Sequence, residues 1–270
     1  MLQLAFGGVI MDHLDAMVDQ ETRIYAYSNK AEYIERHEVG SITPCKSLGD
    51  PSYIKRRKSI CEWFYNVVDH FEMKRETCFI AISFLDRYIK SVGKFDIISE
   101  YRLASISSLY LAIKINEPIQ LTALTFMEMS RGIFSAEDII TREGRILHIL
   151  NWSVNRPTPQ AFSQYYLHLL STSMSLPQCS HRPVKEYSCY LIEISATDDF
   201  FIFIPSYAIA ISSIIVAFEQ FCPLISEGIQ SVSNLLVQNF CCEYVELPDG
   251  SSKIIHDTAK YFRNRISKIK

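Results

Sequence analysis

Glycine and proline are scarce in this chain, and their scarcity excludes several kinds of fold. The 270 residues include only 9 glycines and 10 prolines, too few for the many tight turns that short strands require. Cationic residues are not in excess either, because 27 Lys and Arg against 30 Asp and Glu give a formal net charge of -3. Overall basicity that would indicate nucleic-acid binding is therefore absent. The composition favours a helical protein without a nucleic-acid partner.

Patterns typical of catalysis and metal binding are missing as well. The sequence has no glycine-rich phosphate loop and no nucleophile elbow, and its 7 histidines are scattered without metal-ligand spacing. The 8 cysteines include no CxxC pair, and most lie among apolar residues, which is typical of reduced thiols in an intracellular protein. We expect no enzyme activity, no cofactor, no metal and no small-molecule ligand.

One uncharged run, residues 200–218, nearly reaches the length of a membrane span. Pro205 and three serines interrupt it, and Asp198-Asp199 and Glu219 bound it without basic anchors. The N-terminus also lacks the basic start of a signal peptide. We therefore expect a buried central helix here and no membrane partner.

Apolar residues are abundant and recur at helical spacing. Hydrophobic residues make up 48% of the chain, enough for a large core, and they repeat at three- and four-residue steps. Five helices are predicted at about 60–71, 78–92, 99–115, 121–130 and 135–151. A rigid joint at 156–159 follows, and five more are predicted at about 162–169, 184–194, 205–218, 231–245 and 253–269. The expected domains are an N-terminal extension (1–50, with a possible helix near 11–27), then 51–155 and 156–270.

The two helices expected at the centre of each half share a faint similarity. Residues 107–112 (SSLYLA) resemble residues 212–217 (SSIIVA). Chance similarity between buried helices and an internal duplication of a five-helix unit both explain this. In that alignment Glu219 stands where Lys114 stands, so the lysine belongs to the first copy only.

Two opposite charges occupy positions where helical periodicity calls for apolar residues. Lys114 closes the stripe that includes Tyr110 and Ile113, and Glu143 sits between Ile139 and Ile146. A charge on an apolar stripe is costly unless it is paired or hydrogen-bonded. Either the two residues satisfy each other inside the fold, or they are held at its edge for a partner.

Several motifs between Arg56 and about Leu170 occur in a characteristic order. They are Arg57 with Ile60 and Trp63, Phe84-Leu85-Asp86-Arg87-Tyr88-Ile89, Leu111-Ala112-Ile113-Lys114-Ile115-Asn116-Glu117, Arg142-Glu143, and Arg156-Pro157-Thr158. This segment resembles the N-terminal cyclin box, and the rest of the chain resembles the C-terminal cyclin fold more loosely. The resemblance implies an all-α fold of two consecutive five-helix cyclin-like bundles with an N-terminal extension.

The resemblance also implies a function and a site. It implies a regulatory subunit that binds and activates a cyclin-dependent serine/threonine protein kinase as a heterodimer, in cell-cycle control, in the nucleus, the cytoplasm or both. Lys114 and Glu143 would hold one mobile helix of the kinase. The apolar surround of this pair would be Leu111, Ile115, Leu147, Trp152 and Val154.

Two further pairs of residues follow from the same resemblance. Arg57 and Asp86 are expected to form a structural salt bridge between the first two box helices. Ile60 and Trp63 would contribute to a substrate-docking groove. That groove is expected to be weak, because an added cation at Arg56 disfavours the basic motifs that such grooves take in the family.

Two rival functions remain open at this point. A fold-related transcription factor would need a basic face on the second half, and residues 156–252 contain few cations. A helical scaffold without kinase activation is the other alternative. Binding of a kinase that depends on Lys114 and Glu143 would favour the regulatory subunit over both alternatives.

Overall fold

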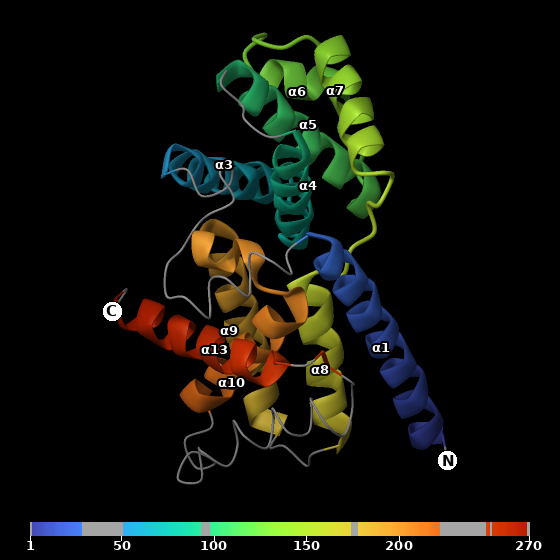
Figure 1. Cartoon of the computed structure of the whole chain (residues 1–270), viewed down its shortest axis with the longest axis vertical. Helices are drawn as coiled ribbons and strands as arrows, with labels where there is room; N and C mark the ends of the chain where they lie inside the picture. The colour runs from blue at the N-terminus through green and yellow to red at the C-terminus, as the bar shows by residue number, and fades with distance from the viewer. Residues whose placement is uncertain are drawn as a thin grey trace. The chain divides into compact units, whose positions relative to one another are not determined.

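The computed structural model describes residues 2–28, 51–92, 98–173, 178–221, 247–248 and 250–268 (Figure 1). Over these ranges the chain forms 10 α-helices and one 3₁₀ helix and has no strand, so the all-α prediction is confirmed. None of the helices in these ranges is both long enough and apolar enough to cross a membrane. The uncharged run from residue 200 instead enters the 3₁₀ helix η1 (Asp199–Phe203) and then α10 (Ser206–Phe221).

The chain forms two compact units. The first unit comprises Ala31–Arg156 together with the short segment Ala196–Ile202. The second unit comprises Met1–Lys30, Pro157–Ser195 and Phe203–Lys270. The domain boundaries expected from the sequence, 1–50, 51–155 and 156–270, stay predictions.

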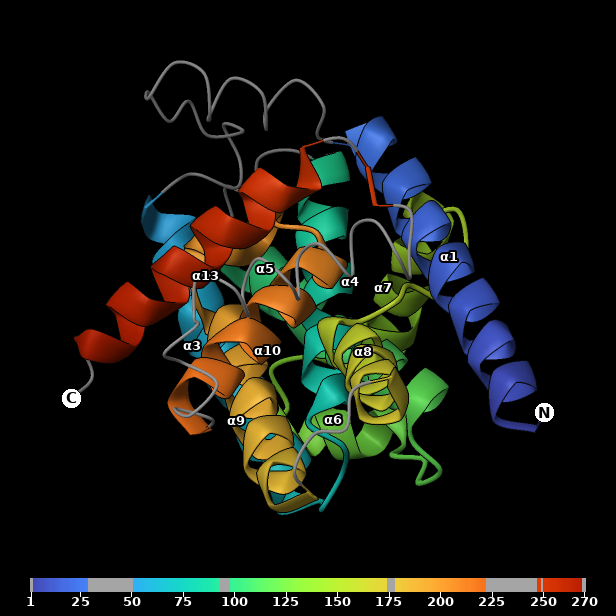
Figure 2. The same ribbon diagram turned by 90° about the horizontal axis from the view of Figure 1, so that it is seen from below.

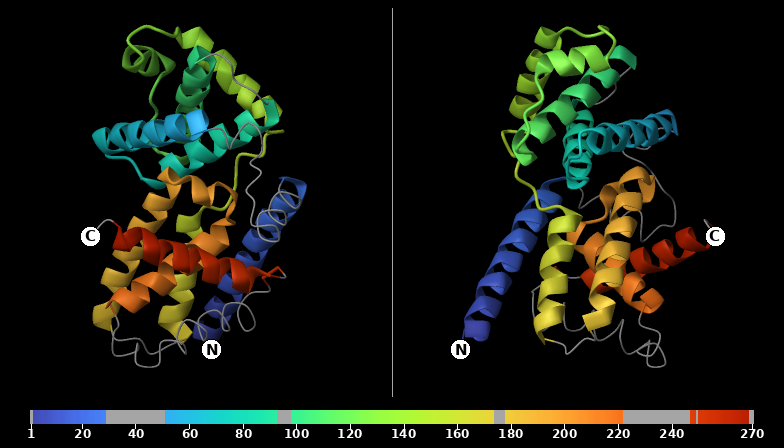
Figure 3. Two further views of the ribbon diagram at one scale, coloured as in Figure 1. Left: turned by 60° about the vertical axis from the view of Figure 1, so that its left-hand side comes forward. Right: turned by 180° about the vertical axis from the view of Figure 1, so that it is seen from behind.

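The first unit is built around one central helix. Its elements are α3 (Pro51–His70), α4 (Glu76–Val92), α5 (Ile98–Asn116), α6 (Ala123–Met129) and α7 (Ala136–Ile149). Helix α5 packs against α4, α6 and α7 (Figures 1 and 3). Every residue from Leu103 to Ile113 is buried, which is why this helix is apolar or small on all sides. The five helices expected in this half are all present.

The second unit has the same kind of centre. Its helices are α1 (Leu2–Ser28), α8 (Pro159–Ser173), α9 (Gln178–Thr197), α10 and α13 (Ser251–Ser267). Helix α10 is buried from Tyr207 to Phe218 and packs against α8 and α13, while α1 packs against α8 (Figures 2 and 3). The helix predicted at 231–245 lies outside the described residues.

Capping residues set where two helices begin. The Ser135 hydroxyl accepts a hydrogen bond from the Asp138 amide at 3.1 Å, and the Asp138 carboxylate accepts one from the Ser135 amide at 2.9 Å. This reciprocal box satisfies two amides at the start of α7. At the start of α8 the Thr158 hydroxyl accepts from the Ala161 amide at 3.1 Å, and Pro159 takes the first helical position.

A serine contact recurs in the two units. The Ser107 hydroxyl on α5 donates to the Ile139 carbonyl of α7 at 3.2 Å. The Ser212 hydroxyl on α10 donates to the Ile255 carbonyl of α13 at 2.9 Å. Both isoleucines have no exposed surface. The same serine of each Ser-Ser pair thus joins the central helix to the last helix, which favours duplication over chance.

We expect Ser135→Ala to lower the free energy of unfolding by about 1 kcal/mol, because the Asp138 amide loses its acceptor. Urea unfolding followed by circular dichroism measures this. Ser59→Ala is the control, since Ser59 is an exposed serine inside α3 and its loss should change stability by less than about 0.5 kcal/mol. Equal effects of the two substitutions would contradict the capping assignment.

Candidate functional site

Lys114 and Glu143 meet at the surface of the first unit. The Lys114 Nζ atom, in the last turn of α5, lies 2.7 Å from the Glu143 Oε1 atom in the middle of α7. The exposed fractions of the two side chains differ: 41% for Lys114 and 8% for Glu143. The sequence left two alternatives open, a pair that satisfies itself inside the fold or charges held at its edge for a partner. The structure has features of both, because the charges pair with each other and the lysine also faces solvent.

Glu143 and Tyr110 both stabilise the charge on Lys114. The hydrogen bond to Glu143 raises the pKa of the Lys114 amine above its usual value, and partial burial opposes this shift. The Nζ atom also lies 4.9 Å from the centre of the Tyr110 ring, within the range of a cation–π contact. Tyr110 stands four residues before Lys114, on the same face of α5.

The end of α5 is fastened to the start of α4. The Asn116 amide group donates to the Thr77 hydroxyl at 2.8 Å, and the Thr77 hydroxyl donates to the Glu117 carboxylate. The same carboxylate accepts from the Lys74 backbone amide at 3.0 Å. These contacts fix the turn that carries Lys114.

Arg142, the residue before Glu143, is held by a separate set of contacts. Arg142 donates to the Tyr88 hydroxyl of α4 at 3.0 Å and to the Glu100 carboxylate in the first turn of α5. Its side chain is 8% exposed. Burial and the hydrogen bonds act on Arg142 in opposite directions, and the net effect raises the pKa of its guanidinium group.

The structure places the predicted apolar surround at different depths. Ile115 is 45% exposed and Trp152 is 71% exposed, while Leu147 and Val154 are half-buried. Leu111 is only 3% exposed, so it lies beneath the surface and offers no contact area of its own.

Sequence reasoning missed Ile140, an apolar residue on the same helix as Glu143 that is 52% exposed. It precedes Glu143 by three residues, and Leu147 follows Glu143 by four, so these three side chains share one face of the helix. Helical spacing alone was the signal that would have found it.

Trp152 stands in an unusual backbone conformation. The Trp152 amide donates to the Leu147 carbonyl at 2.9 Å and the Asn151 amide to the His148 carbonyl at 3.1 Å, which is the Schellman pattern at a helix end. Asn151 has φ 49° and Trp152 has φ 57°. Asparagine tolerates the left-handed region, whereas for tryptophan it costs about 1–3 kcal/mol. A strained and exposed tryptophan is a candidate contact residue.

Arg87 fixes the segment that follows this tryptophan. Its guanidinium donates to the Ser153 carbonyl at 2.8 Å. Burial first, and then the positive charge of Arg156, lower the pKa of Arg87 to about 9. Arg87 of the Asp86-Arg87 motif therefore contacts the backbone next to Trp152, and the sequence did not predict this contact.

Comparison with known proteins bears on this arrangement. The family model described as "Cyclin, N-terminal domain" matches residues 23–155. Among curated proteins, Cyclin-A3-3 of Arabidopsis thaliana is 25% identical over 169 residues, which are 62% of this chain and 46% of that protein. The G2/mitotic-specific cyclin-A of Patella vulgata is 24% identical over 189 residues, 67% of this chain and 42% of that protein. Residues 23–155 therefore belong to the cyclin family as its N-terminal domain.

The cyclin fold is also found among solved structures. The viral cyclin from herpesvirus saimiri superposes with a TM-score of 0.54 at 16% identity, covering 77% of this chain and 86% of that chain. This likeness concerns the fold. The matches to the two curated cyclins span less than half of the length of those proteins.

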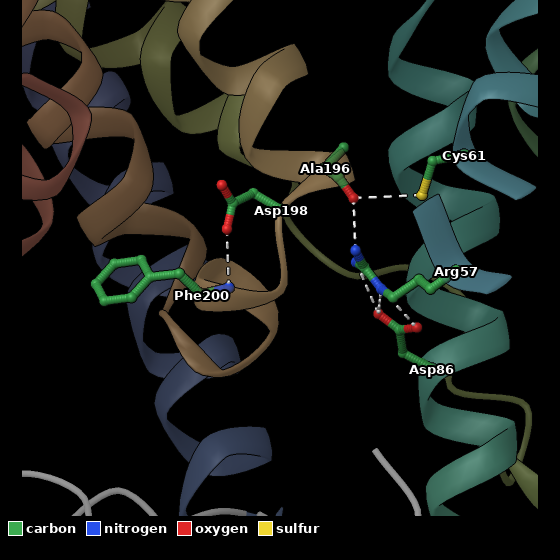
Figure 4. A network of polar contacts seen from close by, with 6 residues as sticks. All are labelled: Arg57, Cys61, Asp86, Ala196, Asp198 and Phe200. Atoms are coloured by element: carbon green, nitrogen blue, oxygen red, sulfur yellow. Dashed lines mark hydrogen bonds and ion pairs between the residues drawn. The ribbon is translucent and has the colours of Figure 1, made fainter. Parts of the chain in front are cut away.

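A second polar network in the first unit surrounds Arg57 (Figure 4). The Arg57 Nη2 atom lies 3.0 Å from the Asp86 Oδ2 atom, and Arg57 Nε donates to both oxygens of Asp86 at 3.1 Å. Its Nη1 atom donates to the Ala196 carbonyl at 2.7 Å, and the Cys61 thiol donates to the same carbonyl at 3.3 Å. The Asp198 carboxylate accepts from the Phe200 amide at 3.1 Å. Arg57 thus joins α3, α4 and the segment Ala196–Ile202.

Ile60 and Trp63 are both half-buried on α3. The Trp63 ring lies 5.6 Å from that of Phe64, and Arg56 lies 5.8 Å from the Tyr101 ring. A docking role for Ile60 and Trp63 stays a prediction. Over the described ranges no group of three or more His, Cys, Asp or Glu residues is placed to hold a metal ion.

We expect alkaline pH to destabilise the protein through Cys61. Burial raises the pKa of this thiol from 9.0 to about 12. Between these values the unfolded state loses the proton and the folded state keeps it, so the free energy of unfolding falls as pH rises, by at most about 1.4 kcal/mol per pH unit. Cys61→Ser keeps a donor for the Ala196 carbonyl and should flatten this slope. Urea unfolding at about pH 8 and about pH 10.5 measures it; equal slopes in both proteins would contradict the assignment.

Proposed function

We propose that this cyclin binds a cyclin-dependent serine/threonine protein kinase and activates it, with Lys114 and Glu143 holding one helix of the kinase. The observation that carries the proposal is the geometry of the pair, 2.7 Å apart with Lys114 41% exposed and Glu143 8% exposed. A pair serving the fold alone has no need of a solvent-facing lysine beside exposed apolar residues. Cell-cycle control is the process we infer.

Both charged groups keep hydrogen-bonding capacity for a partner. A lysine amine has three donors and a carboxylate accepts at two oxygens. Over the described residues, Lys114 uses one donor on Glu143 Oε1, and Oε2 has no hydrogen-bond partner. Lys114 then donates to carbonyl oxygens at the end of the kinase helix, and Glu143 accepts from its amides.

The surrounding apolar surface supports affinity for a helix. Ile115, Ile140 and Trp152 are all more than two-fifths exposed. Gly144 has nothing within 4 Å of the position that a Cβ atom would take, so a partner backbone can approach α7 closely there. Interfaces draw affinity from such aromatic and aliphatic contacts and orientation from charged groups.

Activation follows from drawing the kinase helix inward. In protein kinases a glutamate on one helix must pair with the catalytic lysine, and the position of that helix controls activity. A surface that binds the helix only in its inward position shifts the kinase toward the active state. Lys114 and Glu143 supply the orientation that this selection requires.

We expect Lys114→Ala combined with Glu143→Ala to weaken kinase binding roughly thirtyfold or more, because charged interface contacts are worth about 2–5 kcal/mol. Removing both residues leaves no buried charge unpaired. Calorimetric titration against a panel of purified cyclin-dependent kinases measures binding, and phosphate transfer from ATP to a peptide measures activation.

The second unit offers a matched control for this experiment. The Arg263 guanidinium contacts Glu219 through two bonds of 2.8 and 2.7 Å, with exposed fractions of 36% and 22%. Glu219→Ala with Arg263→Ala removes an inter-helical pair and should leave kinase binding unchanged. Full activation by the Lys114/Glu143 double variant, or no binding by the wild type to any kinase of the panel, would contradict the proposal.

We expect Trp152→Ala to weaken kinase binding by roughly thirtyfold, as removal of an aromatic anchor costs about 2 kcal/mol or more. Because the side chain is 71% exposed, the free energy of unfolding should change by less than about 0.5 kcal/mol. Tyr190→Ala in the second unit, where the side chain is 45% exposed, is the control. Retained affinity in the Trp152 variant would exclude this residue from the interface.

A further inference from the structure

Two adjacent residues of α7 reach toward opposite ends of the same neighbouring helix. Arg142 contacts Glu100 in the first turn of α5, and Glu143 contacts Lys114 in its last turn. These two positions lie roughly 21 Å apart along an ideal helix axis. Between them the Ser107 hydroxyl donates to the Ile139 carbonyl at 3.2 Å, so α7 crosses α5 near its middle.

Burying the charged side chain of Arg142 costs free energy, so its contacts indicate a role other than stability. Its side chain is 8% exposed, and burying a cation carries a large desolvation penalty that an apolar residue would avoid. Tyr88, whose hydroxyl accepts from Arg142 at 3.0 Å, has no exposed surface. Such a buried ionic group contributes orientation more than net stability.

The direction of the contacts shows which motion they oppose. Consecutive helix residues project about 100° apart, so Arg142 and Glu143 pull on α7 from two sides of its axis. Rolling α7 about that axis lengthens at least one of the two sets of contacts. With Arg142 fixed by Tyr88 and Glu100, the Glu143 carboxylate is held beside Lys114 before any partner binds.

We propose that Arg142 is a positioning residue that, through Tyr88 and Glu100, locks the rotation of α7 and so presents Glu143 to Lys114 in the geometry that a partner helix requires. The positioning of the pair concerns this chain alone, while its effect on a kinase rests on the proposed function. Pre-organisation of this kind raises affinity, because the partner does not have to order the site.

The first test uses the isolated protein. Lys114 is labelled with acetic anhydride at increasing pH, and its labelling rate is read by mass spectrometry of peptides. In the wild type the bond to Glu143 holds the pKa of Lys114 above its usual value, which slows labelling. We expect Arg142→Met combined with Tyr88→Phe to raise the rate roughly threefold or more, toward that of Glu143→Gln.

The paired substitution keeps the test informative about positioning. Replacing Arg142 alone would remove a partner from the buried Tyr88 hydroxyl, whereas Tyr88→Phe removes that group too. Glu100 is 42% exposed and is left to solvent. The labelling rate of Lys114 in Arg142→Lys should fall between those of the wild type and the Arg142/Tyr88 variant, because an ammonium group cannot reproduce the two-branched guanidinium contact.

Arg57→Met is the matched control. Arg57 is an equally buried arginine of the first unit, 6% exposed, and it pairs with Asp86. The Arg57→Met substitution should lower the free energy of unfolding without changing the labelling rate of Lys114. An unchanged labelling rate in the Arg142/Tyr88 variant overturns the proposal, and so does an equal rise in the Arg57 variant, which would mean general loosening.

The second test is a double-mutant cycle with the kinase. We expect the Arg142/Tyr88 variant to bind about tenfold more weakly in the wild-type background and to show no additional loss when Lys114 and Glu143 are already alanine. An equal loss in both backgrounds overturns the proposal. If Lys114 labelling responds as expected while the wild type binds no kinase, the positioning role stands and the proposed function fails.

Discussion

The ion pair between Lys114 and Glu143 is the interaction on which the candidate site of the first unit depends. It joins the end of the buried helix α5 to the middle of α7 at 2.7 Å. An uncompensated charge at the carboxylate, which is 8% exposed, would be costly. Pairing satisfies one oxygen of Glu143, and the exposed side of the lysine remains turned to solvent.

Helix α4 supports both members of the pair. Thr77 at its start contacts Asn116 and Glu117 just beyond Lys114, and Tyr88 near its end contacts Arg142 beside Glu143. Arg87 on the same helix holds the Ser153 carbonyl next to Trp152. A single packed helix therefore sets the relative positions of charges and apolar contacts that come from three other segments, and a rigid element is well suited to this task.

The two units share a contact between the central helix and the last helix, but they differ at the end of the central helix. In each, a serine of the central helix donates to an isoleucine carbonyl of the last helix. At the end of α10, however, Glu219 is held by Arg263 through both carboxylate oxygens. A two-branched pair of this kind satisfies both groups with each other, whereas the single bond of Lys114 leaves donors for a partner. This difference offers a physical reason why the first unit would bind a partner at this position and the second unit would not.

Periodicity in the sequence was sufficient to predict helices α3 to α10 and α13, and the buried centres α5 and α10. These features depend on neighbours within a few residues along the chain. The charges at Lys114 and Glu143 were identified because they interrupt an apolar stripe. The roles of Arg142 and Arg87 emerged only from the tertiary structure. Their partners lie dozens of residues away, and side-chain direction is fixed only when the helices pack.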